Sequence, residues 1–238
     1  MKITEEHTVS EIVVQNIKAA HIFKQHGIDF CCGGGISMEK ACSKNKVDFA
    51  IIRKEIEAID EIQERRYAYD TWEVDFLIDH IINVHHVYVE TNIPLLLEYS
   101  NKVAHVHGHH YQEVVKVSEL VKEVVQELTA HMKKEELVLF PYVKKLVWAK
   151  KEGTSLTSPH FGTVNNPIQM MFQEHENAGD VFKEIATLTN GYTPPAEACN
   201  TFRALYSKLE EFEQDLHQHI HLENNILFPK AIQLEQSI

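Results

Sequence analysis

The sequence predicts an all-α protein in which a small helical N-terminal domain precedes a four-helix bundle. Apolar residues recur at helical spacing through most of the 238 residues, and no segment shows the apolar-polar alternation of a half-buried strand. A short pattern that begins at His131 and ends in Leu-Phe-Pro141 recurs from His219 to Pro229, 88 residues further on. Such a repeat indicates a duplicated helical unit.

The N-terminal domain is predicted over residues 1–68. Residues 8–11 (Thr-Val-Ser-Glu) resemble a capping box that begins a helix, and Gly27 ends that helix. Ser37 and Asp48 are suitable N-caps for a short helix and a longer one. The charged and aromatic stretch 64–71 is expected to form the junction to the second domain.

The bundle is predicted over residues 72–238. Its four helical blocks are expected near residues 72–107, 112–150, 166–189 and 196–235, joined by short connections. Pro94 suits the start of a new helix and predicts a break within the first block.

Composition narrows the class of protein. The formal net charge of −12 argues against nucleic acid or an anionic membrane surface as the main partner. The first residues have no apolar run typical of a signal peptide, and no stretch approaches the ~20 apolar residues of a spanning helix. The four cysteines, at positions 31, 32, 42 and 199, are too few and too unevenly placed for a disulfide framework. We therefore expect a cytoplasmic protein.

Each copy of the repeat carries a histidine and a glutamate four residues apart. The pairs are His131 with Glu135 and His219 with Glu223. On an α-helix this spacing places both side chains on one face, about 40° apart. The chain holds 16 histidines, so one such pair means little, but two in the same sequence context favour a metal site.

A lone histidine precedes each copy at a similar distance. His175 lies 44 residues before His219, and His86 lies 45 residues before His131. Two helical hairpins related by a pseudo-twofold axis would therefore each supply one lone histidine and one His-x-x-x-Glu pair. In the first hairpin two adjacent histidines are candidates for the lone ligand. The helical face around His85 is the more apolar, whereas the spacing favours His86.

The faces that carry these pairs are largely apolar, so we expect the pairs in the bundle core. The positions on the two faces are Val124, Leu128, Val138 and Tyr142 around His131, and Phe212, Leu216, Ile226 and Lys230 around His219. Two buried carboxylates require a cation, and four imidazoles with two carboxylates suit two carboxylate-bridged transition-metal ions. The alternatives are a surface ion pair on each helix and a structural zinc site, which usually closes at four ligands and favours cysteine.

The remaining histidines are expected to lie at the surface. His217 and His221 lie about 200° from His219 around the helix, so they cannot share its metal. A solvated tract at a helix end or loop is expected for four further histidines, His105, His107, His109 and His110.

Together these motifs resemble the repair-of-iron-centres family, the hemerythrin-like di-iron proteins that repair iron–sulfur clusters. The resemblance covers nearly the whole chain and predicts a hemerythrin-like bundle. The matching segments are residues 29–34 with the two cysteines, 79–82 with the following His86, 131–136 with Leu-Phe-Pro at 139–141, 174–176 and 219–225.

The resemblance implies a centre of two non-haem iron ions with an oxo or hydroxo bridge. Its implied terminal ligands are His86, His131, His175 and His219, and its implied bridging ligands are Glu135 and Glu223. It also implies a cytoplasmic stress role in which iron–sulfur clusters damaged by nitric oxide or peroxide are restored. Damaged iron–sulfur proteins would then be partners, and nitric oxide or O2 would be small ligands. Iron donation and nitric oxide binding or reduction are both proposed chemistries for the family.

Cys31 and Cys32 are candidates for a redox or transfer role. Adjacent cysteines do not easily bond to each other. Because three glycines and the Ser37 cap follow them, we expect them near a helix N-terminus, where the dipole would lower a thiol pKa. The alternative is that they are two small buried apolar residues.

Two other functions fit the bundle alone: an oxygen or nitric oxide carrier or sensor, and a nitric oxide reductase, which would be an enzyme. A cysteine-bearing N-terminal domain has no purpose in a simple carrier, which ranks cluster repair first. A homodimer is a further arrangement, in which the N-terminal domain docks on the partner's bundle.

Overall fold

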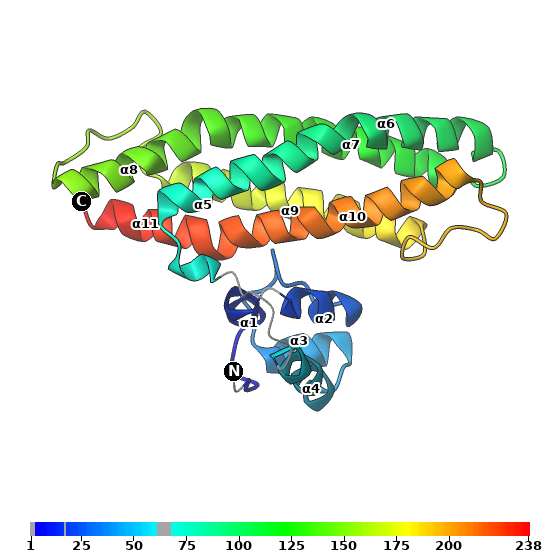
Figure 1. Cartoon of the computed structure of the whole chain (residues 1–238), viewed down its shortest axis with the longest axis horizontal. Coiled ribbons are helices and arrows are strands. Elements are labelled where there is room, and N and C mark those ends of the chain that lie inside the picture. The colour runs from blue at the N-terminus through cyan, green and yellow to red at the C-terminus, as the bar shows by residue number, and fades with distance from the viewer. Residues whose placement is uncertain (1–2, 17, 61–67) are drawn as a thin grey trace.

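A computed structural model describes residues 3–16, 18–60 and 68–238 of the chain. These residues are helical, with an isolated bridge between Thr8 and Ser37 and no strand among them. Long helical rods lie side by side, and a smaller group of helices lies against one side of them (Figure 1). The predicted fold class is therefore confirmed.

The smaller group contains α1 (Val9–Gln15), α2 (Ala19–Gln25), α3 (Met38–Asn45) and α4 (Phe49–Asp60). The capping box is confirmed, because the Thr8 N–H donates to Glu11 Oε2 at 2.8 Å and the Glu11 N–H donates to Thr8 Oγ1 at 3.2 Å. Ser37 caps α3, and the Asp48 carboxylate accepts from the Ala50 N–H at 2.8 Å.

The single helix predicted from residue 8 to Gly27 is instead two helices. Asn16 ends α1 in an extended conformation, with φ −150° and ψ 97°. Its side-chain oxygen accepts from the Lys18 N–H at 3.2 Å, which offers the backbone a local alternative to the helix. Gly27 follows α2 with a positive φ of 69°, as expected for a helix stop.

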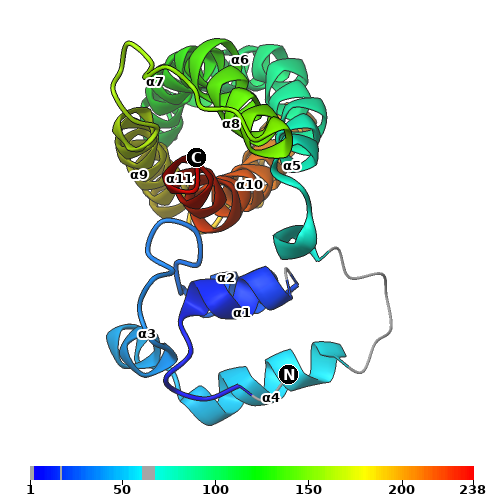
Figure 2. The ribbon, with the colours of Figure 1, turned by 90° about the vertical axis from the view of Figure 1, so that its left-hand side faces the viewer.

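The bundle consists of four rods around a common axis (Figure 2). The first follows a short turn, η1 (Tyr69–Thr71), and comprises α5 (Val74–His80), η2 (Ile81–His86) and α6 (Val87–His107). The second comprises α7 (Glu113–Lys134), η3 (Glu135–Leu139) and α8 (Phe140–Glu152), and the third is α9 (Asn165–Leu188). The fourth comprises α10 (Asn200–Leu222), η4 (Glu223–Leu227) and α11 (Phe228–Gln236). These rods correspond to the four predicted blocks.

The segments η2, η3 and η4 are single π-helical turns within otherwise α-helical rods. In each, a backbone N–H donates to the carbonyl five residues earlier, as from Phe140 to Glu135 and from Phe228 to Glu223. Pro141 and Pro229 follow directly, and proline has no N–H to continue the α-helical ladder. The Leu-Phe-Pro motif therefore marks the place where one extra residue enters each helix.

The π turns correct two predictions. The first rod deviates from α-helix at η2 and not at Pro94, which lies inside the continuous helix α6. From η3 onward the buried face shifts by one residue, so Val138 is 37% exposed while Leu139 and Val143 are buried. The regular period assumed from the sequence fails beyond Glu135 because the π turn adds a residue.

The division into domains 1–68 and 72–238 stays a prediction. Of the predicted junction 64–71, residues 64–67 lie outside the described residues, and Tyr69–Thr71 form η1. In the described part of the chain, no helix is both long and apolar enough to cross a membrane.

Candidate metal centre

The π turns bring ligand-type side chains to the middle of the bundle. His86 ends η2, Glu135 begins η3, and Glu223 begins η4. Helix α9 has no π turn and supplies His175 from its central part. Irregular helical turns of this kind are frequent at functional sites.

The six side chains selected from the sequence meet in two overlapping groups. His86 and His219 form one group with both glutamates, and His131 and His175 form the other with the same two glutamates. Within each group the candidate ligand atoms all lie within 4.8 Å of one another. The six members are at most 3% exposed: His86, His131, Glu135, His175, His219 and Glu223.

The inward-facing atoms of this cluster fit a metal. Both carboxylate oxygens of Glu135 are buried without a hydrogen-bond partner, as are Glu223 Oε2 and His86 Nε2. The Nε2 atoms of His131 and His175 face each other at 3.0 Å. The nearest groups to these carboxylates are imidazole Nε2 atoms, which lie 3.1–3.4 Å from them. Buried carboxylates and imidazole nitrogens that converge in this way are the donor set of a bound transition-metal cation.

The Leu-Phe-Pro motif also shapes the walls of the centre. The ring of Phe140 stacks on His86 with centroids 5.8 Å apart, and the ring of Phe228 stacks on His175 at 6.0 Å. Each phenylalanine thus packs on the lone histidine of its own half of the repeat. These contacts restrict the imidazole planes and keep water away from the carboxylates.

Charges within the metal-free cluster stabilise one another. Burial, and then the like charge of Glu223, would raise the pKa of Glu135, but the neighbouring histidines outweigh both and lower it. Burial would also raise the pKa of Glu223, yet His219 and its neighbours hold it well below its usual range. Burial opposes protonation of His131, but the adjacent Glu135 raises its pKa to about 10.

Metal binding to the metal-free protein is therefore expected to release protons near neutral pH. His131, with a pKa of about 10, is protonated there, and a metal ligand must be neutral imidazole. The affinity should rise with pH, by about tenfold per pH unit for each proton displaced, until the pH reaches the pKa of His131. Calorimetric zinc titrations in buffers of different ionisation enthalpy measure this release. Binding with no proton release would contradict a protonated His131.

His85 lies beside the metal groups and belongs to neither of them. Its Nδ1 atom lies 3.0 Å from Asp215 Oδ1, and its ring stacks on that of His219. The choice of His86 from the spacing therefore agrees with the geometry. Sequence reasoning missed the outer partners of the ligands, Glu136, Glu174 and Asn224, although each directly adjoins a candidate ligand in the chain.

The expected exposure of His217 and His221 is wrong. His221 is 1% exposed, and burial lowers its pKa to about 4. His217 is half-buried, and the Phe30 ring lies 5.7 Å from it and 6.2 Å from His221. Phe30, in the loop between α2 and α3, covers this face of α10, which a helical period alone could not reveal. The tract from His105 to His110 is mainly exposed, as expected.

The loop that carries the two cysteines docks on the bundle. The carbonyl of Cys31 accepts from Asn225 Nδ2 at 3.4 Å, and Asn225 lies in the same π turn as Glu223. The Cys32 sulfur lies over Gly179 of α9, 3.9 Å from where a Cβ would stand. The cysteines thus lie beside two of the rods that supply candidate ligands.

The predicted activation of the cysteines by a helix dipole is wrong for Cys31. Helix α3 begins only at Met38, and the two cysteine N–H groups donate to Asp29 Oδ1, each at 3.1 Å. The Cys31 thiol is buried, and its contacts with Cys32, its burial and the charge of Asp29 raise its pKa well above the usual value. Cys31 is therefore held as a thiol. The two sulfurs are 3.8 Å apart and unbonded.

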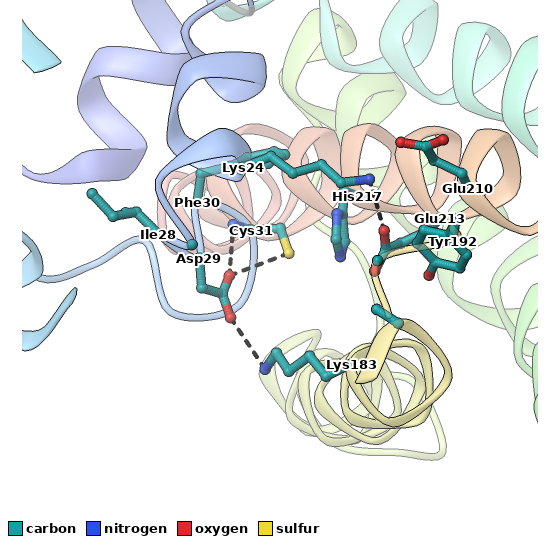
Figure 3. A pocket seen from close by; sticks show the side chains of 13 residues that line it. Lys24, Ile28, Asp29, Phe30, Cys31, Lys183, Tyr192, Glu210, Glu213 and His217 are labelled. Atoms are coloured by element: carbon teal, nitrogen blue, oxygen red, sulfur yellow. Dashed lines mark hydrogen bonds and ion pairs between the residues drawn. The ribbon is translucent and has the colours of Figure 1, made fainter. Parts of the chain in front are cut away.

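A cavity of about 290 Å³ lies beside this contact, between the loop and the bundle (Figure 3). Cys31 and Phe30 line it from the N-terminal side, and His217 and Tyr192 line it from the bundle. The Lys24 ammonium bridges across it to Glu213 Oε2 at 2.7 Å, which ties the two parts together. The cavity gives the Cys31 side chain an approach separate from the metal centre.

Comparison with known proteins agrees with this arrangement. Residues 77–231 match the family described as the Hemerythrin HHE cation binding domain, and residues 5–60 match a family described as a Domain of Unknown function (DUF542). A Probable iron-sulfur cluster repair protein of Haemophilus influenzae is 34% identical over 229 residues, which is 95% of this chain and 97% of that protein. The chain belongs to the hemerythrin-like iron–sulfur cluster repair family.

Other members of the repair family show similar coverage. The Iron-sulfur cluster repair protein YtfE of Musicola paradisiaca is 31% identical over 97% of this chain and 98% of its own length. The protein of the same name from Yersinia pseudotuberculosis is 34% identical over 92% of this chain and 93% of its own. All six candidate ligands lie within the match to the cation-binding domain, and both loop cysteines lie within the N-terminal match.

Proposed function

We propose that this chain is a di-iron protein that repairs iron–sulfur clusters damaged by nitrosative or oxidative stress. It would act by iron donation, by nitric oxide handling, or by both. The observation that carries the proposal is the pair of fully buried glutamates, Glu135 and Glu223, each shared by both groups of four ligand-type side chains. The names of its relatives, iron–sulfur cluster repair proteins, support the choice of function.

In this proposal both glutamates would help to hold both ions, and one pair of imidazoles would hold each ion. The first pair is His86 with His219, and the second is His131 with His175. Bound iron supplies reversible one-electron chemistry and positions for a small diatomic ligand. The chain excludes bulk water from this chemistry through the buried ligands and the rings of Phe140 and Phe228.

Metal analysis and a repair assay test the proposal. Protein purified without oxygen should contain about two irons per chain, and Mössbauer spectra should show a coupled pair. Protein loaded with isotopically labelled iron should then restore a dehydratase whose iron–sulfur cluster was damaged by nitric oxide, with label in the restored cluster. Equal restoration by the same amount of free ferrous iron would contradict a repair role.

The same assays separate the alternatives. Reversible O2 binding without repair would identify a carrier or sensor, and repeated formation of nitrous oxide with a reductant would identify a nitric oxide reductase. Damaged iron–sulfur proteins are the partners that we propose. The cytoplasmic location and the homodimer also stay predictions.

The cysteine pair is expected to act in transfer to the client. Cys32 is the more exposed of the two, while Cys31 is held as a thiol at the cavity. We expect the double variant Cys31→Ser/Cys32→Ser to keep its metal but to restore damaged clusters at least about tenfold more slowly, because both sulfur atoms of the docked loop are lost. Cys42→Ser, in the core of the N-terminal helices, is the control. Repair at the wild-type rate would reduce the pair to a packing role.

A further inference from the structure

The four histidines of the centre differ at the ring nitrogen that faces away from the carboxylates. Three of these Nδ1 atoms are paired with a side-chain oxygen. His86 Nδ1 lies 2.7 Å from Glu136, His131 Nδ1 lies 2.8 Å from Glu174, and His175 Nδ1 lies 2.8 Å from Asn224. His219 Nδ1 is buried and has no hydrogen-bond partner in the described part of the chain.

Such outer partners affect how tightly a histidine holds a metal. They fix the tautomer and the ring orientation and make the inner nitrogen more basic, and their loss typically weakens metal binding by about 10- to 100-fold. The pair His131 and His175 has two outer partners, whereas the pair His86 and His219 has one. The two metal positions are therefore built unequally.

A carboxylate shares a helix face with His219. Asp215 is four residues before His219 on α10, so both side chains lie on one helix face. Asp215 Oδ1 contacts His85 Nδ1 at 3.0 Å, while its Oδ2 is buried without a partner. The rings of His85 and His219 are stacked, 8° from parallel, with centroids 5.5 Å apart. His85 thus lies beside His219 and pairs with the carboxylate that shares the helix face of His219.

We propose that His85 holds Asp215 away from His219, and that this makes the metal position between His86 and His219 the weaker and faster-exchanging one. Asp215 and His85 are positioning residues in this account, because they act on the metal through His219. That the released metal is iron, and that it goes to a damaged cluster, rests on the proposed function. Iron would leave from the position between His86 and His219, while the ion between His131 and His175 stays.

Release of a probe metal tests this without reference to repair activity. The metal-free full chain is loaded with Co(II) and mixed with a large excess of a chromogenic chelator. We expect two phases whose rates differ by at least about tenfold. Glu174→Ala removes the outer partner of His131, so it should speed up the slow phase only. That result would assign the slow phase to the position between His131 and His175.

Substitution of His85 provides the decisive variant. His85→Phe keeps a flat ring against His219 but releases Asp215, so the fast phase should slow by about tenfold. In the double variant His85→Phe/Asp215→Leu the fast phase should return to about its wild-type rate, because no carboxylate is left to pair with His219. A purely structural role of His85 would instead predict faster release in both variants.

The outcomes separate this inference from the proposed function. Two cobalt ions that leave wild-type protein at one rate would overturn the inference alone, whether or not the variants fold. An unchanged or faster fast phase in folded His85→Phe would also overturn it. Failure to bind any metal would overturn the proposed function together with the inference.

Discussion

Replacement of Glu223 by glutamine is expected to abolish stable metal binding at both positions. Glu223 belongs to both groups of ligand-type side chains and is fully buried, so both ions would lose an anionic ligand at once. Since loss of an outer partner alone costs about 10- to 100-fold in affinity, loss of a direct shared ligand should exceed about 100-fold. Metal analysis after gel filtration should show a fall from about two ions per chain to almost none.

Two variants make this result specific. Glu136→Gln changes only the outer partner of His86, so it should weaken one position and leave the other. Glu210→Gln changes an exposed carboxylate on the same helix, α10, and should leave metal content unchanged. Glu135→Gln should behave like Glu223→Gln. Normal metal content and a normal spectrum in Glu223→Gln would remove that residue from the ligand set.

The repeat allowed the site to be predicted because helical spacing and duplication are properties of the sequence itself. His131 with Glu135 and His219 with Glu223 needed only the four-residue spacing and their shared context. Their upstream partners needed the comparison of the two halves. Spacing favoured His86 where local hydrophobicity favoured His85, and it is His86 that lies in one of the groups of ligand-type side chains. His85 is buried as well, because it packs beside the centre, on His219.

The sequence could not reveal features that depend on a change of period or on contacts between distant segments. The π turns shift the buried face after Glu135, so Val138 was placed in the core and Leu139 was not. Burial of His221 depends on Phe30, nearly two hundred residues away. The protonated state of Cys31 depends on its contact with Cys32, on its burial and on the charge of Asp29, which outweigh a distant helix dipole.

Removal of each metal ion is expected to lower the midpoint of thermal unfolding by roughly 8–16 °C. An ion that binds only the folded chain stabilises it by about 4 kcal/mol when its free concentration is about a thousand times the dissociation constant. For a chain of about this size, each 1 kcal/mol shifts the midpoint by about 2–4 °C. Calorimetry of the loaded protein before and after chelation measures the shift.

The variant that cannot bind metal supplies the control for this shift. Chelator should not change the unfolding midpoint of Glu223→Gln, because that chain has no bound ion to lose. The metal-free wild type should remain folded, since its buried carboxylates keep their charge beside His131 and His219, as the lowered pKa values of Glu135 and Glu223 indicate. Equal midpoints for loaded and metal-free wild type would mean that the metal contributes little to folding. The centre would then be held in place by the four rods and the π turns alone.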